Sequence, residues 1–357
     1  MDFLNEKLQE RISTNSLRTL QATKGMVDFC SNDYLGIARN DLIKISGNYK
    51  HGSSGSRLLA GNSPFVEEIE RAIATFHQGE AALVFNSGYD ANLGLLSCIG
   101  SKESTIIYDQ LCHASIRDGI RLSRAQSFSF LHNDTADLEK KLKISKGNSF
   151  IVTESVFSMD GHLAPLEAIS NLAEKYNAEL IVDEAHAIGI IGEKGEGLAQ
   201  CKNIHQKCFA RIYTFGKACG VHGAAIVGSE SLRNYLINFA RSFIYTTALP
   251  EASIAAIEAS YNIFPTLIKE RLYLQELIYR MQHSDLNIIK SQSPIQAIIV
   301  PGNIVVKNLA KKLQQNNMDA RAILYPTVPE GLERIRVIVH SYNTIEQVEK
   351  LIYILKE

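Results

Sequence analysis

The chain has 357 residues, of which 45% are hydrophobic and 21% are charged, proportions typical of a globular protein. Its 37 basic and 38 acidic residues nearly cancel, so the composition offers no general attraction to nucleic acid or to an anionic membrane. The chain is longer than one hydrophobic core usually serves, which predicts two packed units. Any anion that the protein binds must therefore be held by local groups.

The cysteines and the first residues of the chain bear on the cellular compartment in which the protein is expected. Six cysteines are scattered without a Cys-x-x-Cys pair, which favours reduced thiols in a cytosolic protein and gives no reason to expect a metal. The segment after Met1 carries too many charges for a signal peptide. No run approaches the roughly 18 apolar residues that a membrane span needs. The sequence thus predicts a cytoplasmic protein.

The first third of the chain begins with a helix. Apolar residues recur with helical spacing over residues 2–23, and Gly25 follows. A stretch rich in glycine and serine extends over residues 52–62. A second helix is predicted from Pro64, with Ser63 as its N-cap, because serine and proline favour these positions.

The middle of the chain alternates between strands and helices. Four short apolar runs end in polar residues, as parallel strands buried on both faces do; they cover residues 81–85, 104–109, 149–154 and 178–183. Helical segments such as residues 165–176 lie between them. This alternation predicts an α/β fold with a large, mostly parallel sheet.

The last third of the chain has a different pattern. A long helical region over residues 251–282 leads to a strand at 295–300, a helix at 304–316, a strand at 334–340 and a final helix from Thr344. This pattern predicts a smaller α+β domain. The expected division is an N-terminal helix and arm (1–45), a large cofactor-binding domain (46–252) and a small C-terminal domain (253–357).

Two motifs in the large domain carry reactive side chains. Asp183 ends an apolar strand and His186 follows it, at the edge where α/β sheets bind ligands; Asp183 alone would more often cap the next helix. Lys217 follows Gly216, and a glycine lets the backbone approach a ligand closely. A lone Gly-Lys is a weak signal, and Ala218 after the lysine excludes the Walker phosphate loop.

Two further motifs complete the set. The turn Asn86-Ser87-Gly88 opens a helix, and free N–H groups at a helix start bind phosphate. His113 follows another strand, where its ring could stack on a flat cofactor. Each feature alone is more often ordinary, but together, in this order, they fit a phosphorylated pyridine aldehyde.

These motifs also resemble a known family, the α-oxoamine synthases of the aminotransferase-like pyridoxal-phosphate fold. The resemblance covers nearly the whole chain. Within the family, the sequence is most similar to the branch that serves biotin synthesis. The motifs that match the family are the segments at residues 31–36, 52–61, 113–115, 153–161, 183–186, 214–217 and 325–329. It implies pyridoxal 5'-phosphate as the cofactor and a two-domain fold.

The resemblance implies a role for each cofactor residue. Lys217 would carry the cofactor as a Schiff base and remove the substrate proton, Asp183 would pair with the pyridine nitrogen, and His113 would stack on the ring. His186 would bond the phenolic oxygen, together with Ser158, and Glu154 matches a position near the cofactor. The phosphate would be held by Ser87, Gly88, Tyr89 and Thr214, and by Thr246 or Thr247 reaching over from a partner subunit.

The resemblance implies substrates and a partner as well. Arg336 matches the arginine that holds the amino-acid carboxylate, Asn32 a position near the substrate, and Arg18 an arginine at the acyl-chain entrance. The expected substrates are L-alanine and pimeloyl-CoA or pimeloyl-acyl-carrier protein. The expected assembly is a homodimer with shared active sites.

Alternatives stay open at this point. Relatives join glycine to acetyl-CoA (glycine C-acetyltransferase), glycine to succinyl-CoA, or serine to palmitoyl-CoA (serine palmitoyltransferase). A hypothesis of another class is that the protein is a catalytically silent partner subunit rather than an enzyme. Such a subunit would be expected to lose the lysine, yet Lys217, Asp183 and His113 are all present.

Overall fold

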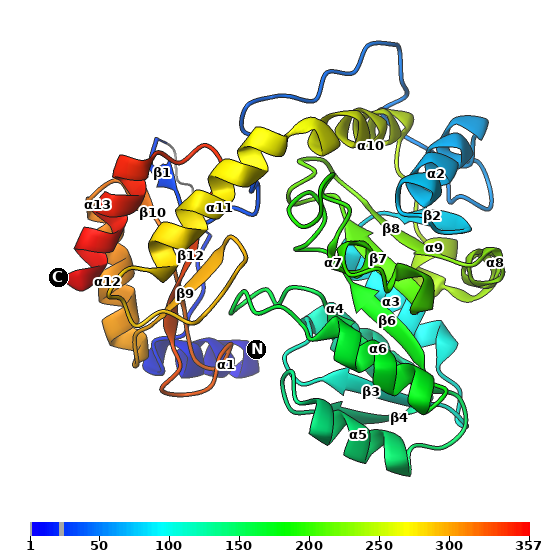
Figure 1. Ribbon diagram of the computed structural model, residues 1–357, viewed down its shortest axis with the longest axis horizontal. Coiled ribbons are helices and arrows are strands. Elements are labelled where there is room, and N and C mark those ends of the chain that lie inside the picture. The colour runs from blue at the N-terminus through cyan, green and yellow to red at the C-terminus, as the bar shows by residue number, and fades with distance from the viewer. Residues whose placement is uncertain (1, 21–24) are drawn as a thin grey trace. The chain divides into compact units, whose positions relative to one another are not determined.

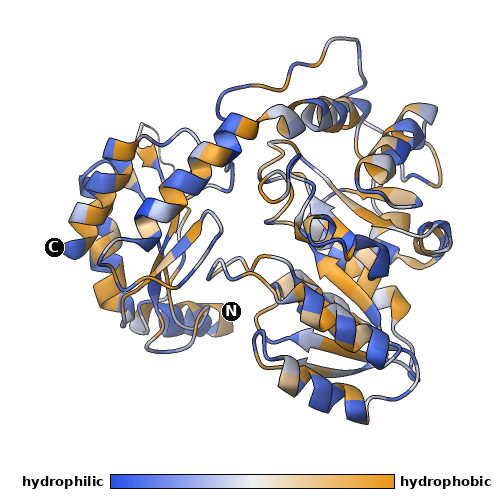
Figure 2. Ribbon diagram, viewed as in Figure 1, coloured by the Kyte–Doolittle hydropathy of each residue, from blue (hydrophilic) through white to orange (hydrophobic). Residues whose placement is uncertain are grey.

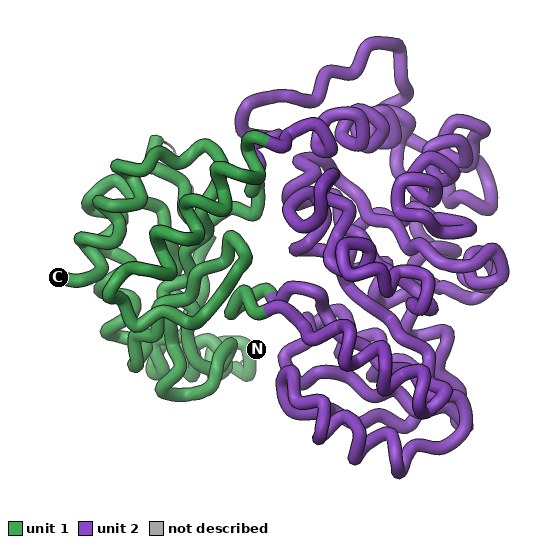
Figure 3. Tube along the Cα trace, in the orientation of Figure 1, with its two compact units in different colours: residues 1–34, 158–162, 269–357 green, residues 35–157, 163–268 purple. Residues whose placement is uncertain are grey.

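The computed structural model describes residues 2–20 and 25–357. The chain forms two compact units (Figure 3). Unit 2 comprises residues 35–157 and 163–268, and unit 1 comprises residues 1–34, 158–162 and 269–357. The short segment 158–162 therefore belongs to unit 1, although both of its flanks belong to unit 2.

Unit 2 is built on a seven-stranded sheet with the order β2-β8-β7-β6-β5-β3-β4 (Figure 1). Strands β3 to β7 pair in parallel, whereas β8 is antiparallel to both of its neighbours. This confirms the mostly parallel sheet. The strands are β2 (Ala81–Phe85), β3 (Thr105–Asp109), β4 (Gln126–Phe130), β5 (Ser149–Glu154), β6 (Glu179–Asp183), β7 (Cys208–Thr214) and β8 (Ala224–Gly228).

Helices cover the sheet of unit 2 because its inner strands are mostly apolar (Figure 2), whereas the edge strand β4 alternates polar and aromatic residues. Ile106 and Val152 belong to a buried cluster with Leu95 and Ile116, so α3 and α4 pack on that face. Alternation along a strand turns the next residues, Ile107 and Ile151, to the opposite face. The helices are α2 (Pro64–Phe76), α3 (Gly88–Ile99), α4 (Ala114–Leu122), α5 (Thr135–Ile144), α6 (Leu166–Lys175), α7 (Leu198–Cys201), α8 (Glu230–Phe239), α9 (Arg241–Ile244) and α10 (Glu251–Ile263), with 3-10 turns η1 (His205–Lys207) and η2 (Phe264–Thr266).

Unit 1 is an α+β structure, as predicted for the C-terminal third. An antiparallel sheet has the order β11-β12-β9, and a short parallel pair joins β1 to β10. Its strands are β1 (Val27–Asp28), β9 (Ile295–Ile299), β10 (Met318–Asp319), β11 (Arg321–Ile323) and β12 (Arg334–Ile338). Its helices are α1 (Asp2–Ser13), α11 (Ile268–Gln282), which begins at the unit boundary, α12 (Asn303–Gln315) and α13 (Ile345–Lys356).

Two helix predictions need correction. The predicted helix over residues 2–23 ends at Ser13, because Asn15 takes a left-handed conformation, with φ 53°, and the Ser16 amide bonds back to Arg11. Residues 21–23 of that prediction lie outside the described residues. The predicted region 251–282 is two helices, since Pro265 cannot continue α10.

The predicted start of α2 is confirmed. Ser63 caps α2 by accepting a hydrogen bond from the Val66 amide, and Pro64 occupies the first turn. No helix in the described part of the chain is long and apolar enough to cross a membrane. The division into domains at residues 45 and 252 stays a prediction.

Candidate active site

The strand ends of unit 2 bring the reactive side chains to one edge. Glu154 ends β5 and Asp183 ends β6, and these two residues are paired in the parallel register. Thr214 ends the neighbouring strand β7, three residues before Lys217. Because the carboxyl ends of adjacent parallel strands meet at the same edge, sequence-distant residues converge there.

Lys217 and His186 are in direct contact. The Lys217 Nζ atom lies 2.9 Å from the His186 Nε2 atom. His186 is buried, with 5% of its surface exposed, and it is placed by the tight turn that follows Asp183. A lysine beside a buried imidazole has a neighbour with which it can share a proton.

Asp183 is held by two amide donors. Its Oδ1 atom accepts from the Ala185 backbone amide at 2.9 Å, and its Oδ2 atom accepts from the Asn92 side chain at 2.7 Å. Each oxygen has one donor, so the carboxylate is fixed in orientation and keeps lone pairs for another partner. Asn92, which lies on α3, is a site residue that the sequence motifs do not predict.

A sequence signal for Asn92 existed. It is an uncharged polar residue in an otherwise apolar stretch, Ala91 to Leu96, and only 2% of its surface is exposed. It also stands four residues after Gly88, which puts both on one face of the helix.

His113 is placed at the start of α4 as its N-cap. Its backbone amide donates to Glu154, and its Nδ1 atom accepts from the Ser115 backbone amide at 3.2 Å. Burial lowers the pKa of His113, against the opposing effect of the nearby Asp183 carboxylate. The imidazole is therefore neutral near pH 7 and carries its proton on Nε2.

Glu154 lies fully inside unit 2. Burial, together with the charge of Asp183, raises the pKa of Glu154 to about 8. A carboxyl group in this environment favours the protonated form. Glu154 accepts the amide hydrogen of His113 with one oxygen, so it links the end of β5 to the start of α4.

We expect Glu154→Gln to flatten the pH dependence of stability. The folded pKa lies above the ordinary value, so Glu154 stabilises the fold at low pH and this contribution is lost as pH rises through about 8. Thermal unfolding of cofactor-depleted protein between about pH 6 and about pH 9 would measure it. The wild type should lose more stability over this range than the variant. Equal losses would contradict the protonated carboxyl, and exposed Glu179→Gln is the control.

The predicted phosphate turn lies at the positive end of α3. Ser87 caps the helix by accepting from the Asp90 amide, and the first-turn amides of Gly88 and Tyr89 have no partner within the helix. A Cβ atom at Gly88 would come within 3.0 Å of the Thr214 hydroxyl oxygen. The Tyr89 side chain turns outward, where its hydroxyl donates to Asp118 at 2.6 Å.

Thr246 and Thr247 lie beside this turn within the same chain. The Asn86 side chain donates to the Thr246 hydroxyl at 3.0 Å and to the Thr247 carbonyl at 2.9 Å. Asn86 directly precedes Ser87, so these contacts join the segment after α9 to the phosphate turn.

Unit 1 holds the predicted substrate residues. Arg336 on β12 donates through one guanidinium nitrogen to the Asn32 side chain at 3.0 Å, and through Nε to the Ser158 carbonyl at 2.7 Å. The Tyr34 hydroxyl also donates to Asn32. The structure thus brings Arg336, Asn32 and Ser158 together, whereas Arg18 lies apart from them and donates to the Thr327 hydroxyl at 3.0 Å.

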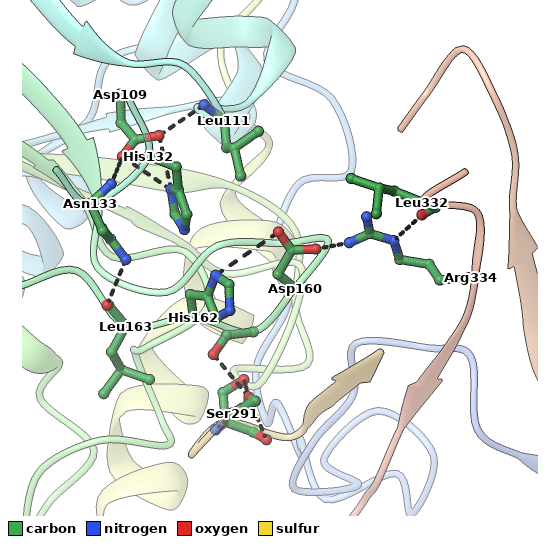
Figure 4. A network of polar contacts seen from close by, with 12 residues as sticks. Asp109, Leu111, His132, Asn133, Asp160, His162, Leu163, Ser291, Leu332 and Arg334 are labelled. Atoms are coloured by element: carbon green, nitrogen blue, oxygen red, sulfur yellow. Dashed lines mark hydrogen bonds and ion pairs between the residues drawn. The ribbon is translucent and has the colours of Figure 1, made fainter. Parts of the chain in front are cut away.

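A neighbouring ion pair fixes the Ser158 segment (Figure 4). Arg334 pairs with Asp160, and Ser291 donates to the Gly161 carbonyl at 2.9 Å. Both Arg334 and Asp160 are buried. The sequence does not predict this pair, because nothing in the local pattern marks residues 174 positions apart as partners.

The side chains of unit 2 fit pyridoxal phosphate. An oriented carboxylate, a lysine beside an imidazole and a neutral histidine are the groups that a phosphorylated pyridine aldehyde requires. The space that a Cβ atom at Gly88 would fill leaves backbone amides of a helix N-terminus open to a phosphate.

Comparisons with known proteins agree with this chemistry. Residues 24–355 match the family Aminotransferase class I and II. An 8-amino-7-oxononanoate synthase of Alkaliphilus oremlandii is 36% identical over 100% of this chain and 96% of its own. The structure of an 8-amino-7-oxononanoate synthase from Francisella tularensis superposes with a TM-score of 0.78 and 31% identity over 93% of this chain and 97% of that one.

A further comparison bears on the fold alone. A serine palmitoyltransferase variant from S. paucimobilis with a bound PLP–myriocin aldimine superposes with a TM-score of 0.87, at 24% identity, over 99% of this chain and 96% of that one. The family of the chain and the side chains at the strand ends of unit 2 identify the protein as an enzyme that uses pyridoxal phosphate. The chain belongs to the class I and II aminotransferase family and, within it, to the α-oxoamine synthases.

Proposed function

We propose that the enzyme condenses L-alanine with a pimeloyl thioester and releases carbon dioxide, which yields 8-amino-7-oxononanoate for biotin synthesis. The observation that carries the proposal is the similarity to 8-amino-7-oxononanoate synthases, at 36% and 38% identity over 100% and 98% of this chain. In this reaction the alanine Cα atom forms a bond to the acyl carbon, the thiol leaves, and the alanine carboxyl group departs as carbon dioxide. The six free cysteines support the cytoplasm as its location.

Lys217 is the residue proposed to carry the cofactor and to move the substrate proton. Bound pyridoxal phosphate supplies an electron-accepting ring next to the alanine Cα atom. The Lys217 Nζ atom takes the proton from Cα, and the contact with His186 supports this role because the imidazole can share a proton with the amine. Asp183 holds a proton on the pyridine nitrogen through its oriented carboxylate.

The other proposed cofactor contacts follow from the donors around this edge. His113, neutral through burial, stacks on the ring without adding a charge. His186 and Ser158 bond the phenolic oxygen, and Glu154 holds His113 by its backbone. The phosphate accepts from the amides at the start of α3 and from hydroxyl groups; the proposed residues are Ser87, Gly88, Tyr89, Thr214, Thr246 and Thr247.

Arg336 is proposed to bind the alanine carboxylate, with Asn32 beside it. Arginine suits this task because its planar group forms two parallel hydrogen bonds to a carboxylate. We expect Arg336→Lys to raise the KM for L-alanine roughly tenfold and Arg336→Ala roughly 100-fold. Steady-state kinetics at saturating acyl donor would measure both values.

The control for Arg336 is its cross-strand neighbour Arg321, which faces it in the β11–β12 register and pairs with Asp319. Arg321→Lys should leave the KM for L-alanine unchanged. An unchanged KM in Arg336→Ala would contradict the proposed carboxylate contact. Arg18→Ala should raise the KM for the acyl donor alone, in keeping with its proposed place at the acyl entrance.

A homodimer is proposed on the basis of an apolar surface in unit 2. Leu122, Phe239 and Tyr245 each expose more than half of their surface and line a groove of about 560 Å³. Apolar surfaces of this kind are usually covered by a partner, and Tyr245 directly precedes Thr246 and Thr247. Sedimentation should give the mass of a dimer, and a monomer at micromolar concentration would contradict a shared site.

The experiment for the proposed function supplies the purified holoenzyme with L-alanine, glycine or L-serine, each with pimeloyl-CoA, acetyl-CoA, succinyl-CoA or palmitoyl-CoA. L-Alanine with pimeloyl-CoA should yield 8-amino-7-oxononanoate, detected by mass spectrometry, and pimeloyl-acyl-carrier protein serves as the second pimeloyl donor. Preference for glycine or serine would assign another α-oxoamine synthase activity. No product from any pair would favour the silent partner subunit.

A further inference from the structure

A series of hydrogen bonds with a buried centre joins two of the proposed cofactor residues. Asn92 on α3 donates to Asp183 at 2.7 Å and to the Ser115 hydroxyl at 3.1 Å. The Ser115 hydroxyl oxygen lies 2.8 Å from the His113 Nδ1 atom. Asn92 and Ser115 expose 2% and 1% of their surface, so solvent does not compete for the two hydrogen bonds of Asn92, whereas the contact between Ser115 and His113 is partly buried. The hydrogen bonds run from Asp183 through Asn92 and Ser115 to His113.

The direction of each hydrogen bond in this series is determined. Asp183 and the Ser115 oxygen both face the Asn92 nitrogen, which has two hydrogens and gives one to each. The Asn92 oxygen is buried and has no hydrogen-bond partner among the described residues. A flipped amide would put that oxygen against the Asp183 carboxylate, so Asp183 itself fixes the amide.

The same logic sets the tautomer of His113. The Ser115 oxygen accepts from Asn92, so its own hydrogen is available for the His113 Nδ1 atom. That atom also accepts the Ser115 backbone amide hydrogen at 3.2 Å. With two donors aimed at Nδ1, the ring proton must lie on Nε2, and burial keeps the ring neutral by lowering the pKa of His113.

We propose that Asn92 and Ser115 are positioning residues that couple the partner of the pyridine nitrogen to the stacking histidine. Asn92 holds the Asp183 carboxylate and the Ser115 hydroxyl, and the Ser115 hydroxyl in turn orients the imidazole of His113. The inference rests on the proposed roles of Asp183 and His113. Loss of either link should change how the cofactor is bound and how it titrates.

The first test measures the dissociation constant of pyridoxal phosphate and the pH midpoint of its visible absorbance band in the holoenzyme. A hydrogen bond to a charged group contributes enough that Asn92→Ala should weaken cofactor binding roughly tenfold or more, with a shifted midpoint. Ser115→Ala should shift the midpoint while weakening binding less. The midpoint is a readout that general loss of stability does not move.

The controls are residues of the same type elsewhere in unit 2, a half-buried asparagine and a buried serine. Asn133 donates to the Leu163 carbonyl at 3.1 Å, and the Ser170 hydroxyl is buried on α6 without a hydrogen-bond partner among the described residues. Asn133→Ala and Ser170→Ala should leave both the dissociation constant and the midpoint unchanged. A change of equal size in the controls would overturn the proposal.

A second pair of variants keeps the proposal testable if Asn92→Ala does not fold. If Ser115 acts through His113, Ser115→Ala should shift the midpoint in the wild type but not in a His113→Phe background. Equal shifts in both backgrounds would overturn the coupling. Asp183→Asn distinguishes failure of the coupling from failure of the proposed cofactor site. If Asp183→Asn changes cofactor binding and folded Asn92→Ala does not, the coupling is wrong. If Asp183→Asn has no effect on cofactor binding, the proposed cofactor site is wrong.

Discussion

Replacing Lys217 with alanine should abolish the covalent attachment of the cofactor and reduce turnover by roughly four orders of magnitude. The variant loses both the amine that binds the cofactor aldehyde and the base that removes the alanine proton. His186, 2.9 Å from the lysine Nζ atom, remains but has no amine with which to share a proton. Steady-state turnover and the visible absorbance of the reconstituted protein would measure the two losses.

Lys217→Arg is the matched control because it keeps a cation beside His186 but has no amine that can bond to the aldehyde. It should be as inactive as the alanine variant. Added primary amines should restore part of the rate to Lys217→Ala and none to Lys217→Arg. Turnover within about tenfold of wild type in either variant would contradict the role of Lys217.

Asp183→Asn should have the second largest effect, a fall in turnover of about 1,000-fold. The amide keeps the size of the side chain but cannot hold a proton on the pyridine nitrogen, so the ring accepts electrons poorly. The hydrogen bond from Asn92 would also meet an amide in place of a carboxylate. Turnover under cofactor saturation separates this effect from weaker binding.

A second buried aspartate of the same sheet provides the control. Asp109 ends β3, accepts from the Leu111 and Asn133 amides, and lies 3.1 Å from His132 (Figure 4). Asp109→Asn should lower the melting temperature without changing the absorbance band of the cofactor. Turnover of folded Asp183→Asn equal to that of folded Asp109→Asn would contradict the pairing with the pyridine nitrogen.

The sequence was most informative where local chemistry and burial agree. Ser63 and Pro64 mark the start of α2, and the apolar run of β5 was predicted with its observed bounds. Strand β4 was not predicted, because Gln126–Phe130 alternates polar residues and is mostly exposed at the sheet edge. The first helix was predicted too long, since apolar spacing alone does not reveal the left-handed Asn15 that ends it.

The site shows the same division between local and long-range information. Motifs beside strand ends indicated Asp183, His186 and Lys217, because a parallel sheet brings such ends together. Asn92 was missed: its contact with Asp183 spans 91 positions, and an asparagine inside a helix gives no local sign of its partner. The Arg334–Asp160 pair was missed for the same reason.

The proposed mechanism depends most directly on Lys217 as the attachment point of the cofactor. Reduction of the holoenzyme with borohydride converts the bond between the cofactor and its lysine to a stable amine, and peptide mass spectrometry locates it. We predict a single modified peptide, with the cofactor on Lys217, and no modification when L-alanine is added in excess before reduction. Modification of a different lysine, or of none in the fully reconstituted protein, would contradict the account.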